Sequence, residues 1–282
     1  MHKNLLMKFS LIALCFCLLS CQSKSHGRVE VQSENFKNEI IDMIYEGNGI
    51  KVYEVPKNTS EICAFYNWNA IDEEIAYQEN DLIVVGKISN IRDVIIEYPF
   101  MGIISANKNT FFDVTISKIL YADDDIHLKE NDTFMLGVPY NSHDRADEYP
   151  LPEEGKEFLI FSCKTSEFEE YPLYKKEYLE YWCSSPEELM LEKIDNYYIG
   201  RDFFQSQTDV YYLYSDLKTL IDRSNDECPI DKTIFYEITQ TLLKRDLLNT
   251  ASSCSPDIYT IYESNNLENI IHEKAHILNE RK

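Results

Sequence analysis

Glycine is scarce in this chain, and the glycine-rich motifs that bind phosphate groups are missing. Only eight of the 282 residues are glycine. The sequence has no G-x-G-x-x-G, P-loop or G-x-S-x-G pattern, each of which needs glycine for a tight turn or a close backbone approach. These absences argue against a dinucleotide-binding domain, a P-loop nucleotide hydrolase and an α/β-hydrolase.

Basic residues are also few. The chain carries 27 Lys and Arg against 49 Asp and Glu, which gives a formal net charge of −22. A surface of this charge repels phosphate backbones, so we expect no nucleic-acid partner. Apolar residues are not lacking, because 44% of the chain is hydrophobic and it contains 20 Tyr and 14 Phe. This composition predicts a folded protein and not a disordered stalk.

Cysteines at the spacing of a zinc site are absent after residue 21. No two of the five cysteines in this part have CxxC spacing, so we expect no cysteine-ligated zinc. In an exported protein, Cys163 with Cys183 and Cys228 with Cys254 are plausible disulfide pairs, which would leave Cys63 unpaired. The alternative is that all five are small buried hydrophobic residues.

The first twenty residues have the pattern of an export signal. Lys3 and Lys8 are followed by an apolar run over 9–19, which is shorter than the about 20 residues of a membrane-spanning helix. The run ends in Leu18-Leu19-Ser20-Cys21, which resembles the lipobox of bacterial lipoproteins. The alternative is an ordinary secretory signal with a chance cysteine.

The lipobox resemblance implies a location. In such lipoproteins the cysteine thiol, here that of Cys21, takes a diacylglycerol group, and cleavage makes this cysteine the first residue. Two or three acyl chains anchor a protein stably, since each buried methylene contributes about 0.8 kcal/mol. We therefore expect an exported protein that is lipid-anchored to the cell membrane or outer membrane of a bacterium.

Apolar alternation and helical periodicity predict an α+β protein. The expected fold is an antiparallel OB-like β-barrel or sandwich with a C-terminal helical portion, and a bend or bulge is expected at Gly86. The predicted strands cover 50–55, 81–91, 111–120, 132–138, 157–163 and 211–214, and the predicted helices cover 35–45, 70–80, 186–198, 215–223, 231–248 and 267–279. The predicted organisation is a signal peptide at 1–20, a tether at 21–33, a β-barrel-like domain with flanking helices at 34–224 and the helical portion at 225–282.

Three strand sequences carry a second resemblance. Asp81-Leu82-Ile83-Val84-Val85-Gly86-Lys87-Ile88, the stretch from Val114 to Leu120, and Gly155-Lys156-Glu157-Phe158-Leu159-Ile160-Phe161 resemble strands of the OB-like barrels, netrin-like or TIMP-like, of bacterial lipoproteins. That resemblance implies an interaction fold more than a reaction, and it transfers no catalytic residues.

One sequence has a catalytic pattern. His272-Glu273-Lys274-Ala275-His276 matches HExxH, in which two histidines bind zinc and the glutamate activates water. Helical periodicity places Leu267, Ile270, Ile271, Ala275 and Leu278 on one stripe and both histidines on the opposite face, beside Glu268. This face is predicted to be solvated, and only six residues follow His276 where a third ligand is usual. We therefore favour a surface helix over a zinc-dependent metallopeptidase.

The remaining pattern is the acidic triplet Asp123-Asp124-Asp125. It lacks the spacing of a calcium loop, so we predict a solvated hairpin turn. With no cofactor expected, the leading hypothesis is a non-enzymatic, membrane-anchored lipoprotein that binds an unknown envelope protein or ligand. The alternatives are the metallopeptidase and a small-ligand or glycan-binding lipoprotein.

Overall fold

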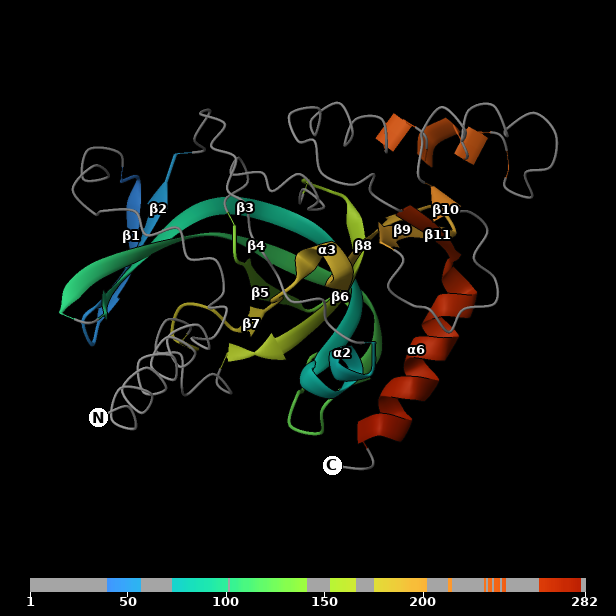
Figure 1. Ribbon diagram of the computed structural model, residues 1–282, viewed down its shortest axis with the longest axis horizontal. Coiled ribbons are helices and arrows are strands. Elements are labelled where there is room, and N and C mark those ends of the chain that lie inside the picture. Colours follow the sequence, from blue (N-terminus) through green and yellow to red (C-terminus); the bar gives the residue numbers. More distant parts are fainter. Residues whose placement is uncertain are drawn as a thin grey trace, which may run out of the picture.

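The computed structural model describes residues 40–56, 73–100, 102–140, 153–165, 175–201, 213–214, 259–279 and part of 231–241. In these residues a large, mostly antiparallel sheet is combined with a C-terminal helix, so the α+β class is confirmed (Figure 1). The strands are β1 (Asp42–Gly47), β2 (Ile50–Val55), β3 (Leu82–Phe100), β4 (Ile103–Ala122), β5 (Thr133–Val138), β6 (Glu157–Lys164), β7 (Tyr181–Trp182), β8 (Met190–Ile194), β9 (Tyr197–Arg201), β10 (Leu213–Tyr214) and β11 (Tyr259–Glu263). The helices are α2 (Glu73–Glu79), α3 (Pro186–Leu189) and α6 (Ser264–Asn279).

A long hairpin of β3 and β4 organises the sheet. The two strands have 19 and 20 residues, so the strands predicted over 81–91 and 111–120 exist but are much longer than expected. One edge of β3 pairs with β4, and the other pairs with β6 over 82–87 and with β2 over 93–97. From β4 the pairing continues to β5, then in parallel to β7, and from β7 to β6. The series of paired strands β3, β4, β5, β7 and β6 therefore returns to β3.

Gly86 marks the place where β3 bends. The register between β3 and β4 shifts between Val85 and Gly86, which confirms the predicted bulge. A Cβ atom at this glycine would lie 2.4 Å from Cγ1 of Val114 and 3.1 Å from the carbonyl oxygen of Thr115. The backbones of β3 and β4 thus approach so closely that only glycine fits without a shift of its neighbours.

The N-terminal part of the sheet corrects one prediction. The helix predicted over 35–45 is wrong in its described part, because residues 42–47 form β1. Asn48 and Gly49 connect β1 to β2 with φ angles of 52° and 79°. Positive φ at both central residues is what a two-residue hairpin turn of type I′ requires, and Asn-Gly is the preferred pair. The turn chemistry overrides the helical spacing of the isoleucines before it.

The C-terminal part mixes strands with helices. The helix predicted over 186–198 is wrong: it is replaced by the four-residue α3 and a hairpin of β8 and β9 with Asp195 in its turn at φ 51°. β11 pairs with β9 and β10, so the segment after residue 225 is not wholly helical. The helix predicted over 267–279 is confirmed as α6 and begins at Ser264. The helix predicted over 215–223 lies outside the described residues, and that over 231–248 is described only in part, where most residues are helical.

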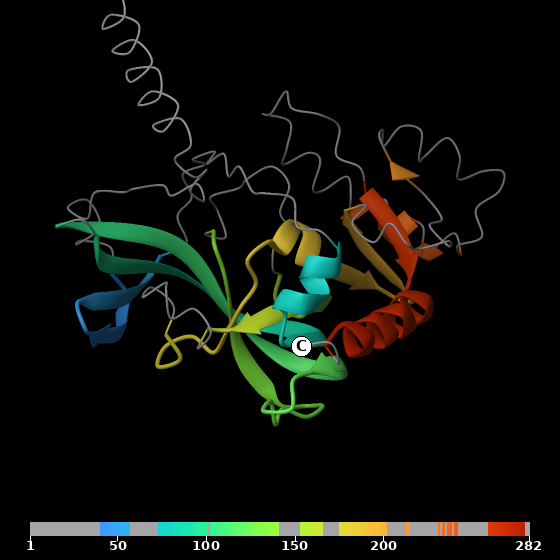
Figure 2. The ribbon, with the colours of Figure 1, turned by 60° about the horizontal axis from the view of Figure 1, so that its bottom comes forward.

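Two hydrophobic clusters stabilise the described fold. One lies under α2 and α6, and the other lies along β2 and the half of the β3–β4 hairpin that is far from α6; Figure 2 shows where these elements lie. In the first, Leu267, Ile271 and Ala275 of α6 pack with Ala76 and Tyr77 of α2 and with the inner side chains of β3, β4 and β6. In the second, Trp182 packs with residues of β2 and of the far half of β3. In α2, by contrast, Ile75 is 41% exposed.

Candidate functional site

Helix α6 holds the HEKAH sequence against β4. Ile271 and Ala275 are fully buried, whereas His272 and His276 are exposed, as predicted. Nevertheless, Nδ1 of His272 lies 2.8 Å from the carbonyl oxygen of Leu120 near the end of β4. The ring of His276 lies edge-on to that of His272 at 4.5 Å and to that of Tyr121 at 5.7 Å, measured between ring centroids.

Glu268, one turn before His272, is buried, and its predicted place on a solvated face is wrong. Its residue surface is 6% exposed. Oε1 accepts a hydrogen bond of 2.5 Å from the hydroxyl of Tyr198, and Oε2 lies 2.6 Å from Nζ of Lys118. Burial, and then the hydrogen bond to this carboxylate, raise the pKa of the Tyr198 hydroxyl well above its usual range. Glu268 therefore joins α6 to both β4 and β9.

The other residues of the HEKAH sequence divide between solvent and contacts with α2. Glu273 is exposed. Nζ of Lys274 lies 2.6 Å from Oε1 of Glu73 and 5.8 Å from the ring centroid of Tyr77. The sequence therefore contributes an ion pair and a cation–π contact that hold α6 on α2.

The His272 contact also bears on metal binding. An imidazole whose Nδ1 contacts a backbone carbonyl keeps Nε2 as the nitrogen that would bind a metal, and this is the usual arrangement behind metal-bound histidines. In the described residues, however, no group of three or more His, Cys, Asp or Glu side chains is placed to hold a metal ion. The described part of the chain offers two neighbouring imidazoles without a third ligand.

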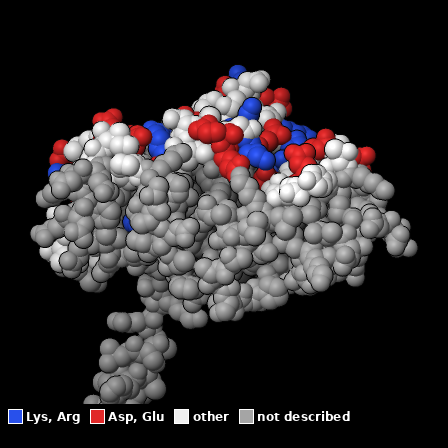
Figure 3. Space-filling view, turned by 90° about the horizontal axis from the view of Figure 1, so that it is seen from above, with Lys and Arg blue, Asp and Glu red and all other residues white. Residues whose placement is uncertain are grey.

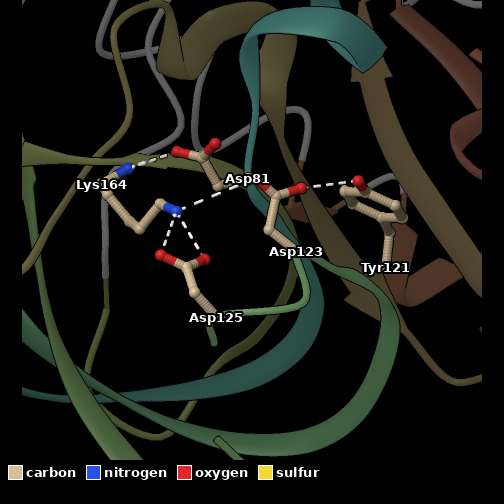
Figure 4. A network of polar contacts seen from close by, with 5 residues as sticks. All are labelled: Asp81, Tyr121, Asp123, Asp125 and Lys164. Atoms are coloured by element: carbon tan, nitrogen blue, oxygen red, sulfur yellow. Dashed lines mark hydrogen bonds and ion pairs between the residues drawn. The ribbon is translucent and has the colours of Figure 1, made fainter. Parts of the chain in front are cut away.

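A second polar network lies at the adjoining ends of β3, β4 and β6 (Figure 4). Asp81, 2% exposed, accepts a hydrogen bond of 2.7 Å from the backbone N–H of Lys164. Nζ of Lys164 lies 2.7 Å from Oδ1 of Asp125 and 3.8 Å from Oδ2 of Asp123. The hydroxyl of Tyr121 donates to Oδ1 of Asp123 at 2.6 Å. This network ties the acidic turn after β4 to β6.

Lys164 is the one cation among the five residues of this network. The hydrogen bond from Lys164 is the main cause that lowers the pKa of Asp125, while burial and then Asp123 raise the pKa of Tyr121. The ammonium group of Lys164 thus supplies a positive charge to the acidic turn. Sequence reasoning missed this partner because Lys164 is 39 residues from Asp125. Tyr121 touches both Asp123 and His276, so the two polar networks meet at its ring.

Of the two predicted cysteine pairs, only Cys163 and Cys183 lie in the described residues. Cys163 lies in β6 opposite Trp182 of β7, and its thiol donates to the carbonyl oxygen of Trp182 at 3.3 Å. Cys183 follows Trp182, so its side chain points to the opposite face, and the two cysteines belong to different core clusters. A disulfide between them would need a change of this local register. The remaining predicted cysteines, Cys21, Cys63, Cys228 and Cys254, lie outside the described residues.

Several charges of the described fold lie in ion pairs. Acidic and basic side chains lie side by side on the described part of the face shown in Figure 3. Ion pairs join lysines to carboxylates, among them Lys51–Glu46, Lys118–Glu268, Lys156–Glu192, Lys193–Glu157 and Lys274–Glu73. The described part of this face therefore carries interspersed charges of both signs.

Among the described helices, none combines the length and the apolar character needed to cross a membrane. Comparisons of the whole chain with protein-family models, with curated proteins and with solved structures yield no match.

Proposed function

We propose that this protein is exported and anchored to a bacterial membrane through lipid on Cys21, and that its folded part is a non-enzymatic binding module of the cell envelope. The observation that carries the proposal is the sequence Leu18-Leu19-Ser20-Cys21 at the end of an apolar run of signal-peptide length. The net charge of −22 supports an envelope protein or a ligand, and not a nucleic acid, as the partner.

We further infer that β3, β4, β5, β7 and β6 close into a small OB-like barrel. The support is the cyclic series of strand pairs, in which β3 pairs with both β4 and β6. Within this ring the third and fifth strands, β5 and β7, are parallel, while the other neighbours are antiparallel. This is the Greek-key order of a five-stranded OB fold, which is used mainly for binding.

The contacts of the HEKAH sequence favour a structural role for it. Lys274 holds α6 on α2, and Nδ1 of His272 contacts Leu120 of β4. Glu268, one turn before this sequence, holds the same helix on β4 and β9. A zinc-dependent peptidase is the alternative. It is supported by the contact of His272 Nδ1 with a backbone carbonyl, which leaves Nε2 to bind a metal, and the metal content of the protein tests it. A small-ligand or glycan-binding lipoprotein is the third hypothesis, since it shares the anchor and differs only in what is bound.

The anchor is tested by expressing the full chain in a bacterium that processes lipoproteins. The mature protein should begin at Cys21, carry the mass of the acyl groups and partition into detergent. A Cys21→Ala variant should lose the lipid mass and remain in the aqueous phase. Cys17→Ala, which alters a cysteine in the same apolar run, is the matched control and should behave as the unchanged chain. An unlipidated, secreted protein with Cys21 intact would overturn the proposal.

A further inference from the structure

The hairpin of β3 and β4 ends in an apolar tip at the opposite end of the molecule from α6 (Figures 1 and 2). Ile103 and Ile104 are 56% and 60% exposed, and Phe100 is half-buried. Gly102 turns the chain with φ of 82°, and nothing lies within 4 Å of the position that a Cβ would take there. We call Phe100, Gly102, Ile103 and Ile104 the hairpin tip.

The sequence around the hairpin tip is uncharged. Residues 98–107 contain no Asp, Glu, Lys or Arg, although these types make up 27% of the chain. The turns of hairpins are normally polar, because they face water on most sides. Exposed aliphatic side chains gathered at such a place mark a surface that is covered by a partner or a membrane.

One aromatic side chain of the hairpin tip, Phe100, fits a bilayer surface. The ring of Phe100 lies edge-on to that of Tyr98, with centroids 6.4 Å apart. Tyr98 is almost fully buried, so it supports the half-buried ring of Phe100 from within the fold and does not itself face a membrane. Aromatic rings that follow an aliphatic end are typical of segments that reach the boundary between headgroups and acyl chains.

The distance from the anchor permits this contact. Asp42 of β1 is in register with Glu54 of β2, which pairs with Val94 of β3. From Val94 to Phe100, which is paired with Ile103, β3 extends by about 20 Å at about 3.3 Å per residue. The 19 steps from Cys21 to Ile40 span at most about 60 Å. A lipid on Cys21 and the hairpin tip therefore reach the same membrane plane.

We propose that the hairpin tip inserts into the surface of the bilayer to which the chain is anchored and forms a second attachment point. This inference rests on the proposed lipid anchor. A bilayer suits the tip better than a protein does, because the tip is a projecting turn without charges that a protein partner would have to match. It also lets a chain of net charge −22 approach anionic headgroups through its uncharged end.

The test places a tryptophan at the hairpin tip. The full, lipidated chain with Ile103→Trp is reconstituted into phosphatidylcholine vesicles whose acyl chains are brominated, since bromine quenches tryptophan only at the depth of the acyl chains. Ile75→Trp on α2 is the matched control, because Ile75 is also an exposed isoleucine, 41% exposed, but lies beside α6. The unchanged chain gives the background of Trp68 and Trp182. We expect a loss of fluorescence for Ile103→Trp and none for Ile75→Trp.

The outcomes separate this proposal from the anchor. Vesicle-bound protein with no more quenching at position 103 than at position 75 would overturn the hairpin insertion and leave the anchor standing. If the mature chain carries no acyl mass on Cys21, the anchor fails, and the Cys21→Ala chain then tests by flotation whether the tip alone binds vesicles. The partition of the Cys21→Ala chain into vesicles should fall about tenfold when Ile103→Ser and Ile104→Ser are added together. A Cys21→Ala chain that does not partition into vesicles at all would overturn the proposal. If the unchanged chain is a dimer in detergent and the same two substitutions make it a monomer, the tip binds a second copy of the chain. That result would overturn insertion into the bilayer.

Discussion

Glu268 on α6 and Tyr198 on β9 are joined by a hydrogen bond of 2.5 Å although they are 70 residues apart. The carboxylate also receives the ammonium group of Lys118 at 2.6 Å. One side chain thereby fixes the final helix to two strands of the sheet, and the helix covers the core cluster through Leu267 and Ile271.

Glu268→Ala should lower the free energy of unfolding by about 2–3 kcal/mol, because it leaves the hydroxyl of Tyr198 buried without its acceptor. Tyr198→Phe, which removes only one hydrogen bond, should cost about 1 kcal/mol. Chemical denaturation measures both. Glu273→Ala, an exposed position on the same helix, is the control and should change stability by less than about 0.5 kcal/mol. Equal effects at positions 268 and 273 would contradict the role of the buried carboxylate.

Gly86→Ala should destabilise the fold by about 1–3 kcal/mol, because the new Cβ would meet Cγ1 of Val114 at 2.4 Å. Adding Val114→Ala to Gly86→Ala removes that atom and should restore part of the loss, although the carbonyl of Thr115 stays at 3.1 Å. Thermal unfolding of the two single variants and the double variant forms the cycle. Additive losses would show that the close contact of β3 with β4 is not what excludes a side chain.

Alkaline pH should unfold the protein through its tyrosines. Burial, and then the hydrogen bond to Glu97, raise the pKa of Tyr53 from 10.0 to about 12. Burial is also the main cause that raises the pKa of Tyr181 to about 12. The folded state therefore favours the neutral phenols, and their stabilising contribution is complete below about pH 10.

This contribution should be lost as the pH rises through 10 towards 12 and beyond, since the unfolded chain releases these protons first. Tyrosinate absorbance, recorded for the native and the urea-unfolded chain, measures the difference. Tyr53→Phe should flatten the decline of stability with pH while leaving the neutral-pH fold intact. Titration of all tyrosines together near pH 10 in the native protein would refute the expectation.

The metal content of the purified full chain tests the alternative function. We expect less than one tightly bound zinc per chain, and the same value for the His272→Ala, His276→Ala double variant. The reason is that the described residues place two imidazoles together without a third ligand. One zinc per chain that is lost in the double variant would instead favour the peptidase, with a third ligand from another part of the chain.

Local patterns in the sequence located most of the central strands but not their lengths. Alternation in 111–120 identifies β4, yet the strand extends from Ile103 to Ala122. The extra length runs through uncharged and mixed residues that pair with β3, and β3 is in turn held there by β2, which is a tertiary effect. Asn48-Gly49 was a readable hairpin signal, and the helical spacing of Ile40, Ile41 and Ile44 concealed it.

The candidate site was harder to predict for a related reason. Helical periodicity placed His272 and His276 on the exposed side of α6, which is confirmed. It also placed Glu268 in water, because periodicity treats every charged residue as solvated. The partners that bury Glu268 are Lys118 and Tyr198, both distant in sequence, and no local pattern indicates them. The uncharged run over 98–107, in contrast, was visible in the sequence alone.

The pairing of β9 with β11 has a consequence for how the chain is made. β9 ends at Arg201, and the strand that covers its edge comes only at Tyr259–Glu263. Until that later segment emerges during synthesis or export, β9 presents unpaired N–H and C=O groups of the kind that recruit strands from other molecules. A chaperone that holds the chain open during this interval would protect it from aggregation, and a premature stop between the two strands would leave a product with a permanently open edge.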